Sequence, residues 1–280
     1  MYKVTYVNNE VEYFDNEILC YRSYVNIGLK DKLKTYLLSD IINDYKRDCY
    51  TRGKRYDKYL YFHKLPDAIE YSRVPHTISP YALGVLLAEG CLGEVSKRNS
   101  LEIASEEIDI VERMMSGAGL DNYTFDGEYS YSFPQYKNMN VGLVKQEIIR
   151  MGIDKPAIDK FIPNEYLEDS IENRKELLRG LVDTDGTLAT KKNQKNYHVM
   201  YCTTSPELCK SVKRLAVELG YGINITHRKI DRKNKHDTYE IRIYTPDIIW
   251  SSKKNYDKVI GKEYRSNQHI CTAIKNIEEV

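Results

Sequence analysis

Apolar positions alternate in some stretches of the chain and recur at helical spacing in others, and this pattern divides the sequence into parts. The first part, residues 1–77, opens with alternating segments at Tyr2–Val7 and Val11–Phe14, which predict strands. A helical pattern follows at Leu33–Lys46. Two prolines, Pro75 and Pro80, mark the boundary between this part and the rest of the chain. We interpret residues 1–77 as a small N-terminal α/β accessory region.

The rest of the chain contains the same order of elements twice. An apolar helix ends in a carboxylate and a glycine at Ala82–Gly90 (ALGVLLAEG) and again at Leu178–Gly186 (LRGLVDTDG). Each is followed by a strand, a basic turn, a second strand, a capped helix and further strands. The predicted strands are Cys91–Val95, Leu101–Ala104 and Ser130–Phe133 in the first copy, and Thr187–Thr190, Tyr197–Cys202, Ile223–Thr226 and Thr238–Tyr244 in the second. This order predicts a duplicated α+β fold, with repeats at 78–165 and 166–260 and a C-terminal helix or connector tail at 261–280.

Small residues one turn apart mark one face of each apolar helix. Gly84 lies four residues before Ala88, and Gly180 lies four residues before Thr184. Such a face lets two helices pack with their backbones almost in contact, so we expect Gly84 and Gly180 at a helix interface.

This packing would bring the carboxylates at the two helix ends, Glu89 and Asp185, close together. Two adjacent carboxylates repel unless a proton or a cation lies between them. Mg²⁺ prefers carboxylate and carbonyl oxygens, so the pattern favours a divalent metal at this place.

Composition and charge exclude several classes of protein. Lysine and arginine number 42 and the acids 41, so the net charge is +1 and a polyanion would have to be bound by a local basic patch. Six cysteines form no C-x-x-C pair, which argues against a zinc knuckle or a thioredoxin-type site. The sequence contains neither a run of 18 apolar residues nor a secretory signal pattern. We therefore expect a soluble, cytoplasmic protein without a membrane partner.

The two motifs resemble those of the LAGLIDADG homing endonucleases, in particular the dodecapeptide (DOD) type found in inteins. LLRGLVDTDG at Leu177–Gly186 is a nearly full match, whereas LGVLLAEG at Leu83–Gly90 has Glu89 where Asp is commoner. DKFIP at Asp159–Pro163 resembles the K-x-I-P block of the intein enzymes. The resemblance implies two αββαββα repeats in a monomer with internal pseudo-two-fold symmetry. It also implies metal-dependent cleavage of both strands of a long DNA site, leaving short 3′ overhangs.

The resemblance also implies roles for individual residues. Glu89 and Asp185, with main-chain oxygens of Ala88 and Thr184, would hold Mg²⁺ or Mn²⁺, which would polarise the phosphate and activate water. Lys160 would be an active-site lysine, although a lysine before Ile-Pro can also simply end a helix. By pseudo-symmetry the second lysine is either Lys253 or Lys254, and the sequence does not choose between them.

Basic residues on the predicted turns are candidates for DNA contact, because a two-stranded ribbon fits the major groove. The candidates are Lys97, Arg98, Lys191, Lys192, Lys195, Arg228, Lys229, Arg232, Lys233 and Lys235. Residues 1–77 mix lysines and arginines with tyrosines, which also suits DNA phosphate contact, although a packing layer is the alternative.

Two other functions remain open at this stage. The fold could serve a catalytically inactive nucleic-acid-binding protein, such as an RNA maturase or a DNA-binding regulator, or a structural protein. An acid in both motifs argues against a pure binder, because a binder has no need of paired carboxylates facing a polyanion. The splicing residues of an intein are missing, since the chain begins with Met1 and has no Thr-x-x-His block. We therefore expect no splicing, and the chain is either an endonuclease region of an intein or a free-standing descendant.

Overall fold

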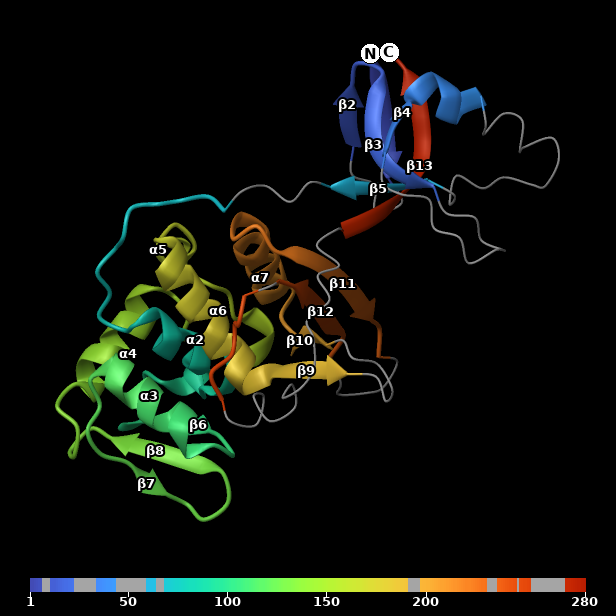
Figure 1. Cartoon of the computed structure of the whole chain (residues 1–280). Helices are drawn as coiled ribbons and strands as arrows, with labels where there is room; N and C mark the ends of the chain where they lie inside the picture. Colours follow the sequence, from blue (N-terminus) through green and yellow to red (C-terminus); the bar gives the residue numbers. More distant parts are fainter. Residues whose placement is uncertain are drawn as a thin grey trace. The chain divides into compact units, whose positions relative to one another are not determined.

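The chain folds into two units, and the smaller one is built from both ends of the sequence. The computed structural model describes residues 1–6, 11–22, 34–43, 59–63, 68–190, 197–230, 236–245, 247–252 and 270–280. Met1–Leu65 and His269–Val280 form the smaller unit, and Pro66–Gln268 forms the larger one (Figure 1). No helix in the described part of the chain is long and apolar enough to span a membrane.

The smaller unit is one six-stranded sheet with the order β2-β1-β13-β5-β3-β4, in which all neighbours are antiparallel. Its strands are β1 (Tyr2–Tyr6), β2 (Val11–Phe14), β3 (Glu17–Arg22), β4 (Lys34–Leu37), β5 (Tyr59–His63) and β13 (Ile270–Glu279). Val4 on β1 lies opposite Ile277 on β13, and both side chains are buried. The pairing of β1 with β13 therefore brings the two ends of the chain together, with Val4 and Ile277 in a buried apolar contact.

Two elements of this unit differ from the prediction. The helix expected at Leu33–Lys46 is wrong in its first part, which is strand β4, and residues 38–43 alone are helical in the described segment. Residues 270–279 of the tail, which was expected to be a helix or connector, form strand β13, which pairs with β1 on one side and β5 on the other. Both partners come from the far end of the chain, so local periodicity could not reveal this pairing.

The second repeat of the larger unit follows the predicted order. It consists of α6 (Ile171–Asp185), β9 (Gly186–Thr190), β10 (Tyr197–Thr203), α7 (Pro206–Glu218), β11 (Gly222–Arg228) and β12 (Thr238–Tyr244). The strands form an antiparallel sheet with the order β11-β12-β10-β9. Ser205 begins α7, because its side chain accepts a hydrogen bond from the Leu208 N–H and Pro206 follows at the first helical position.

The first repeat has the same topology with one strand fewer. It consists of α2 (Pro80–Glu89), the short 3₁₀ helix η1 (Leu92–Glu94), β6 (Ser100–Ala104), α3 (Ile108–Ala118), β7 (Thr124–Phe125), β8 (Ser130–Pro134) and α4 (Val141–Arg150). Its sheet order, β6-β8-β7, matches β10-β12-β11 of the second repeat. The duplication therefore holds for helices and sheets alike.

The strand expected at Cys91–Val95 is wrong. The chain turns into η1 there, and only Gly90 makes a bridge, to Ile103 on β6. Leu92 and Val95 are both buried, and their spacing of three residues places them on one side of a 3₁₀ turn rather than on opposite faces of a strand.

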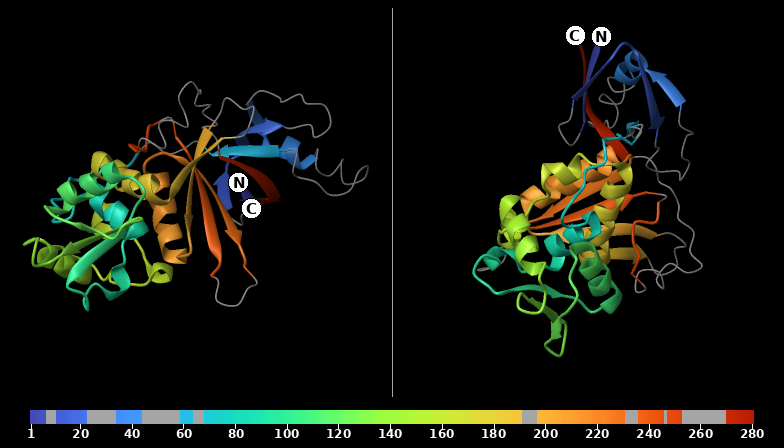
Figure 2. Two further views of the ribbon diagram at one scale, coloured as in Figure 1. Left: turned by 90° about the horizontal axis from the view of Figure 1, so that it is seen from below. Right: turned by 90° about the vertical axis from the view of Figure 1, so that its left-hand side faces the viewer.

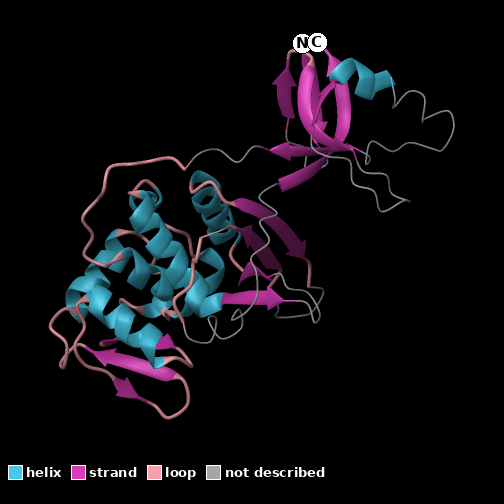
Figure 3. Ribbon diagram, in the orientation of Figure 1, coloured by secondary structure: helices cyan, strands magenta, loops and turns pink. Residues whose placement is uncertain are grey.

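Helices α2 and α6 lie side by side in the middle of the larger unit, with one sheet on each side (Figure 2). The helices of the two repeats fill the space between the sheets, as the colouring by secondary structure makes clear (Figure 3). The contact is apolar, since Leu83, Leu86, Leu178 and Leu181 are fully buried. Between the repeats the chain forms η2 (Ala157–Asp159) and the single-turn helix α5 (Asn164–Leu167).

Asp169 ties together the starts of the two central helices. One carboxylate oxygen accepts the Val74 N–H at 2.9 Å, and the other lies 2.6 Å from Nε2 of His76, in the segment that leads into α2. The same carboxylate accepts hydrogen bonds from the Ser170 N–H and the Asn173 amide at the start of α6. The segment that leads into α2 and the start of α6 are therefore held by the same carboxylate.

Candidate functional site

The two central helices cross at Gly84 and Gly180. A Cβ added to Gly84 would lie 2.4 Å from the Leu177 carbonyl oxygen, and one added to Gly180 would lie 2.2 Å from the Tyr81 carbonyl oxygen. The added Cβ atoms would also lie close to the other glycine, at 3.0 Å from the Gly180 Cα and 3.1 Å from the Gly84 Cα. No residue with a side chain fits at either place without moving a backbone.

Each helix ends at its acid. The residue that follows must be glycine, because there is no room for a side chain beside the last turn of the helix. Gly90 and Gly186 leave the helices with extended backbone, at φ −73° and −86°. In that conformation a Cβ on Gly90 would lie 2.3 Å from the Leu86 carbonyl oxygen, and one on Gly186 would lie 2.2 Å from that of Val182. The acid-glycine pair thus ends both helices by the same geometry.

The structure brings Glu89 and Asp185 into hydrogen-bond contact with each other. Burial of its carboxyl group raises the pKa of Asp185, while the charge of Lys160 and the hydrogen bond with Glu89 act in the opposite direction. Two negatively charged carboxylates in contact repel each other unless a proton or a cation lies between them. The pair therefore favours the binding of a positive charge.

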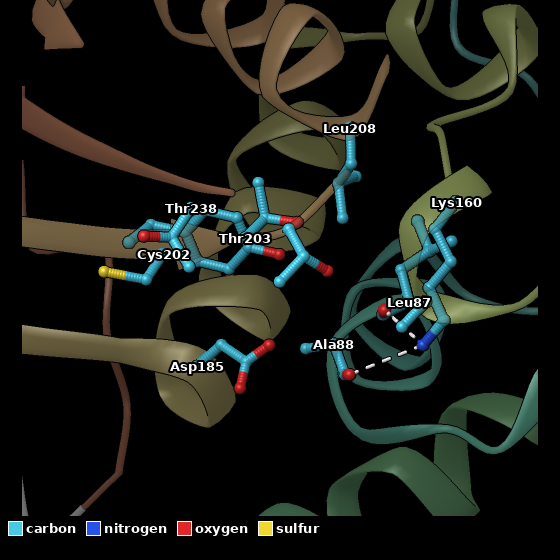
Figure 4. Close-up of a pocket in the computed structure, with 11 residues that line it drawn as sticks. Leu87, Ala88, Lys160, Asp185, Cys202, Thr203, Leu208 and Thr238 are labelled. Carbon is cyan, nitrogen blue, oxygen red and sulfur yellow. Dashed lines mark hydrogen bonds between the residues drawn. The ribbon is translucent and has the colours of Figure 1, made fainter. Parts of the chain in front are cut away.

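Lys160 lies beside the pair and points at the end of α2 (Figure 4). Its side chain is 5% exposed, and Nζ donates to the carbonyl oxygens of Leu87 at 2.8 Å, Gly90 at 2.9 Å and Ala88 at 3.4 Å. Burial lowers the pKa of Lys160, and the charges of Asp185 and Glu89 oppose that shift. Lys160 thus donates to the last carbonyls of α2, and its ammonium lies in the field of both acids.

Each acid lines a different cleft. Asp185 and Lys160 line a cleft of about 210 Å³ together with Ala88 and residues of β10, and Figure 4 shows Asp185 facing Ala88 across it. Glu89 lines a second cleft, of about 280 Å³, together with Thr184 and the turn that follows β6. The residue before one acid therefore lies in the cleft of the other acid, as expected of a pseudo-symmetric site.

The donor set fits a hard divalent cation. Two carboxylates and the main-chain oxygens of Ala88 and Thr184 would offer only oxygen donors, and the hydroxyl of Thr184 is turned away, since it donates to Gly180 O at 2.8 Å. In the described part of the chain no three His, Cys, Asp or Glu side chains gather to hold a metal. A cation at this place would take the remaining ligands from water or a phosphate.

Asp183, two residues before the end of α6, has a structural role that the sequence did not indicate. Its carboxylate accepts hydrogen bonds from Tyr81 OH at 3.0 Å, from the Ser251 N–H at 2.7 Å and hydroxyl at 2.5 Å, and from the Ser252 N–H at 3.0 Å. The chain is thereby fixed to α6 just before Lys253 and Lys254, which lie outside the described residues.

Four of the candidate DNA-binding residues lie in the described part of the chain. Lys97 is exposed on the turn before β6, and Arg98 pairs with Glu102. Arg228 at the end of β11 is 61% exposed and pairs with Glu240, while Lys229 follows it and is exposed. The other candidates, Lys191, Lys192, Lys195, Arg232, Lys233 and Lys235, lie outside the described residues.

The outer face of the second sheet adds polar residues that the turns alone did not suggest. Arg242 on β12 also pairs with Glu240, at 2.5 Å, and lies between Met200 on β10 and Asn224 on β11. These residues alternate with the buried Ile241 and Ile243, so they face away from the helices. Period-two polarity in β12 is the signal that could have identified them.

Residues 172–262 match the family model of the LAGLIDADG-like domain. This segment is similar to the LAGLIDADG-like domain. The match covers the second repeat and begins within α6, so it confirms the resemblance of the motif that ends at Asp185 and Gly186. The first repeat has the same order of helices and strands around the same helix crossing.

Two much longer curated proteins contain segments similar to this chain. The replicative DNA helicase DnaB of Mycobacterium intracellulare is 26% identical over 191 residues, which are 68% of this chain and 27% of that protein. The ATP-dependent DNA helicase Hel308 of Thermococcus kodakarensis is 34% identical over 122 residues, 43% of this chain and 10% of that protein. The chain thus spans about a quarter or less of these relatives.

Solved structures of the homing endonuclease I-DmoI are also similar. Mesophilic variants of I-DmoI give a TM-score of 0.37 at 13% identity, covering 66% of this chain and 93% of that one. I-DmoI in complex with DNA and Mn gives 0.31 at 13% identity, covering 66% and 97%. Because both TM-scores are low, the description of the fold depends on the strand order and helix crossing described above.

Proposed function

We propose that this protein is a site-specific homing endonuclease that makes metal-dependent double-strand breaks in a long DNA site and leaves short 3′ overhangs. The observation that carries the proposal is the contact between Glu89 and Asp185, each at the end of one of two crossing helices, with the Lys160 ammonium beside them. A site symmetric about this crossing offers one acid and one cleft to each DNA strand. The chain would act as a monomer, because both halves of the site lie in one polypeptide.

The residues of the chain would divide the work as follows. Glu89 and Asp185, with main-chain oxygens of Ala88 and Thr184, would hold Mg²⁺ or Mn²⁺. When bound, such an ion polarises a phosphate and lowers the pKa of water. Lys160 would stabilise the negative charge that develops on the phosphate, since its ammonium is already held in place by α2. Either Lys253 or Lys254 would do so for the other strand.

Basic residues of both repeats would bind the DNA backbone. Lys97 and Arg98 in the first repeat, and Arg228 and Lys229 in the second, lie on turns or strand ends beside the two sheets. In our proposal the lysines and arginines of the 191–195 and 232–235 segments belong to the same surface. Affinity for DNA would then fall steeply with salt, as it does for any protein that displaces counterions from phosphates.

We also propose that the chain derives from an intein and works in the cytoplasm on nucleoid or phage DNA. Support comes from the two helicases, in which the similar segment is a minor part of a much longer protein.

A cleavage screen tests the proposed function. The protein is incubated with a plasmid library carrying randomised or candidate insertion sites, with Mg²⁺, with Mn²⁺ and with EDTA. We expect double-strand cuts at one sequence with either metal and none with EDTA. Glu89→Gln and Asp185→Asn should each lower the cleavage rate about 100-fold or more, because each removes charge from the metal-binding pair.

Asp126→Asn is the matched control, because Asp126 is an exposed acid in a loop of the first repeat. It should cut at the wild-type rate. Cutting that persists in the Glu89→Gln and Asp185→Asn double variant would contradict the mechanism. Tight, salt-sensitive DNA binding by the wild-type chain without any cutting would instead identify the protein as an inactive binder of the maturase or regulator type.

A further inference from the structure

Tyr201 lies directly beneath the end of α6. It is on β10, opposite Gly186 on one side and Ile241 on the other, and Gly186 is the residue after Asp185. The side chain is 1% exposed, on the side of the sheet that faces the helices. It lines the same cleft as Asp185 and Lys160.

The Tyr201 hydroxyl is buried and has no hydrogen-bond partner in the described part of the chain. Three other buried tyrosines of this unit differ in this respect. Tyr81 donates to Asp183, Tyr166 donates to the Ile78 carbonyl at 2.7 Å, and Tyr221 donates to Asp247 at 2.6 Å. A buried hydroxyl without a partner lowers the stability of the protein. A ligand that accepts a hydrogen bond from this hydroxyl would remove that penalty.

The cleft that Tyr201 lines also contains groups that can donate to an anion. Besides Asp185, its lining combines one lysine with four hydroxyl-bearing residues, namely Tyr201, Thr203, Thr204 and Thr238. Burial, together with the nearby charges of Asp185 and Glu89, raises the pKa of Tyr201 well above its usual value, so the hydroxyl keeps its proton. The protonated hydroxyl can therefore donate a hydrogen bond to a negatively charged group in the cleft, and it carries no negative charge that would repel that group.

We propose that Tyr201 is a further catalytic residue of this centre, whose hydroxyl donates a hydrogen bond to an oxygen of the DNA phosphate bound in the cleft of Asp185 and Lys160. This inference depends on the proposed endonuclease function. The proton stays on Tyr201 throughout, because the hydroxyl stabilises charge on the phosphate and transfers nothing. A neutral donor fixed in a buried site is effective in this role, since it needs no rearrangement as the charge develops.

The test compares two tyrosine variants that lose only a hydroxyl. Tyr201→Phe and Tyr166→Phe are prepared with the wild-type chain, and a synthetic duplex carrying the site selected in the cleavage screen is the substrate. Three quantities are measured: the single-turnover cleavage rate with Mg²⁺, the affinity for the duplex with Ca²⁺, and the melting temperature without metal. Tyr166 is the matched control because its hydroxyl has a partner at the far end of α2.

The two variants should behave in opposite ways. Tyr201→Phe should cleave about 100-fold more slowly, while its melting temperature stays the same or rises because no protein hydrogen bond is lost. Its pH profile should keep the wild-type shape. Tyr166→Phe should melt about 2–6 °C lower, because the Ile78 carbonyl loses its donor, and should cleave at the wild-type rate.

Three results would overturn the role of Tyr201. If the cleavage rate of Tyr201→Phe lies within about 3-fold of the wild-type rate, the hydroxyl does not contribute to catalysis. If its melting temperature falls as much as that of Tyr166→Phe, its role is structural. If the wild-type chain cuts no substrate at all, the proposed function fails and the role of Tyr201 fails with it, whereas the first two results leave the endonuclease function intact.

Discussion

Asp183 shows how one side chain can give the two halves of a duplicated site different tasks. Its counterpart in the first motif helix is Leu87, which is buried and apolar. Asp183 instead accepts four hydrogen bonds and joins α6 to Tyr81 on α2 and to residues 251–252. The position of the acid in the motif was visible in the sequence, but its partners lie far away in the chain, so its task was not.

Two substitutions at Asp183 should differ in cost. In Asp183→Asn the amide oxygen can still accept the Ser251 and Ser252 N–H groups, and its NH₂ can donate to the two hydroxyls, so we expect a loss of about 1 kcal/mol. Asp183→Ala leaves all four donors without an acceptor and should cost about 3–5 kcal/mol. Urea unfolding of the two variants measures both values, and equal losses would show that the carboxylate does not hold this segment.

At the scale of elements, the arrangement of α2 and α6 depends on the two glycines where they cross. Gly84 and Gly180 allow the backbones to touch, and this contact puts the ends of both helices at one place. The hydrophobic pattern of the helices was sufficient to predict that they are buried, and the spacing of the glycines was sufficient to predict that they pack together. The single bridge at Gly90, where a strand was expected, could not be predicted in this way, because η1 is stabilised by burial of Leu92 and Val95.

Gly84→Ala should weaken this crossing, since the new Cβ would lie 2.4 Å from the Leu177 carbonyl oxygen and 2.9 Å from the Leu181 nitrogen. Both contacts are backbone atoms, so the helices must separate, and we expect a loss of about 2–4 kcal/mol together with slower cleavage. Gly142→Ala in α4 is the control. Its Cβ would meet only the end of the Gln135 side chain, at 3.1 Å, so this change should be neutral or stabilise by up to about 1 kcal/mol. Thermal unfolding of both variants decides between these outcomes.

At the scale of the whole molecule, the chain consists of two units with separate cores, and the smaller one contains both described ends of the sequence. Val4 and Ile277 belong to one core, whereas Val212 on α7 belongs to the other. Units with separate cores can unfold separately, so a single free energy of unfolding need not describe this protein.

Calorimetry should therefore resolve two unfolding transitions. Val4→Ala should lower the midpoint of one of them and Val212→Ala that of the other, each by the effect of about 1–3 kcal/mol expected for a truncated, fully buried valine. The two variants serve as controls for each other. A single transition that shifts with both substitutions would show that the two units unfold together.

The duplication, the acids that end the two motif helices and the glycines between those helices could be predicted from the sequence alone. All of these features depend on the types of side chain at short spacings, and helical and strand periodicity show them directly. Three other features became visible only in the folded chain: residues 270–279 form a strand between β1 and β5, Asp183 holds residues 251–252, and the Tyr201 hydroxyl is buried without a partner in the described part of the chain. These features arise from contacts between residues far apart in the chain, and such contacts leave no periodic pattern in the local sequence.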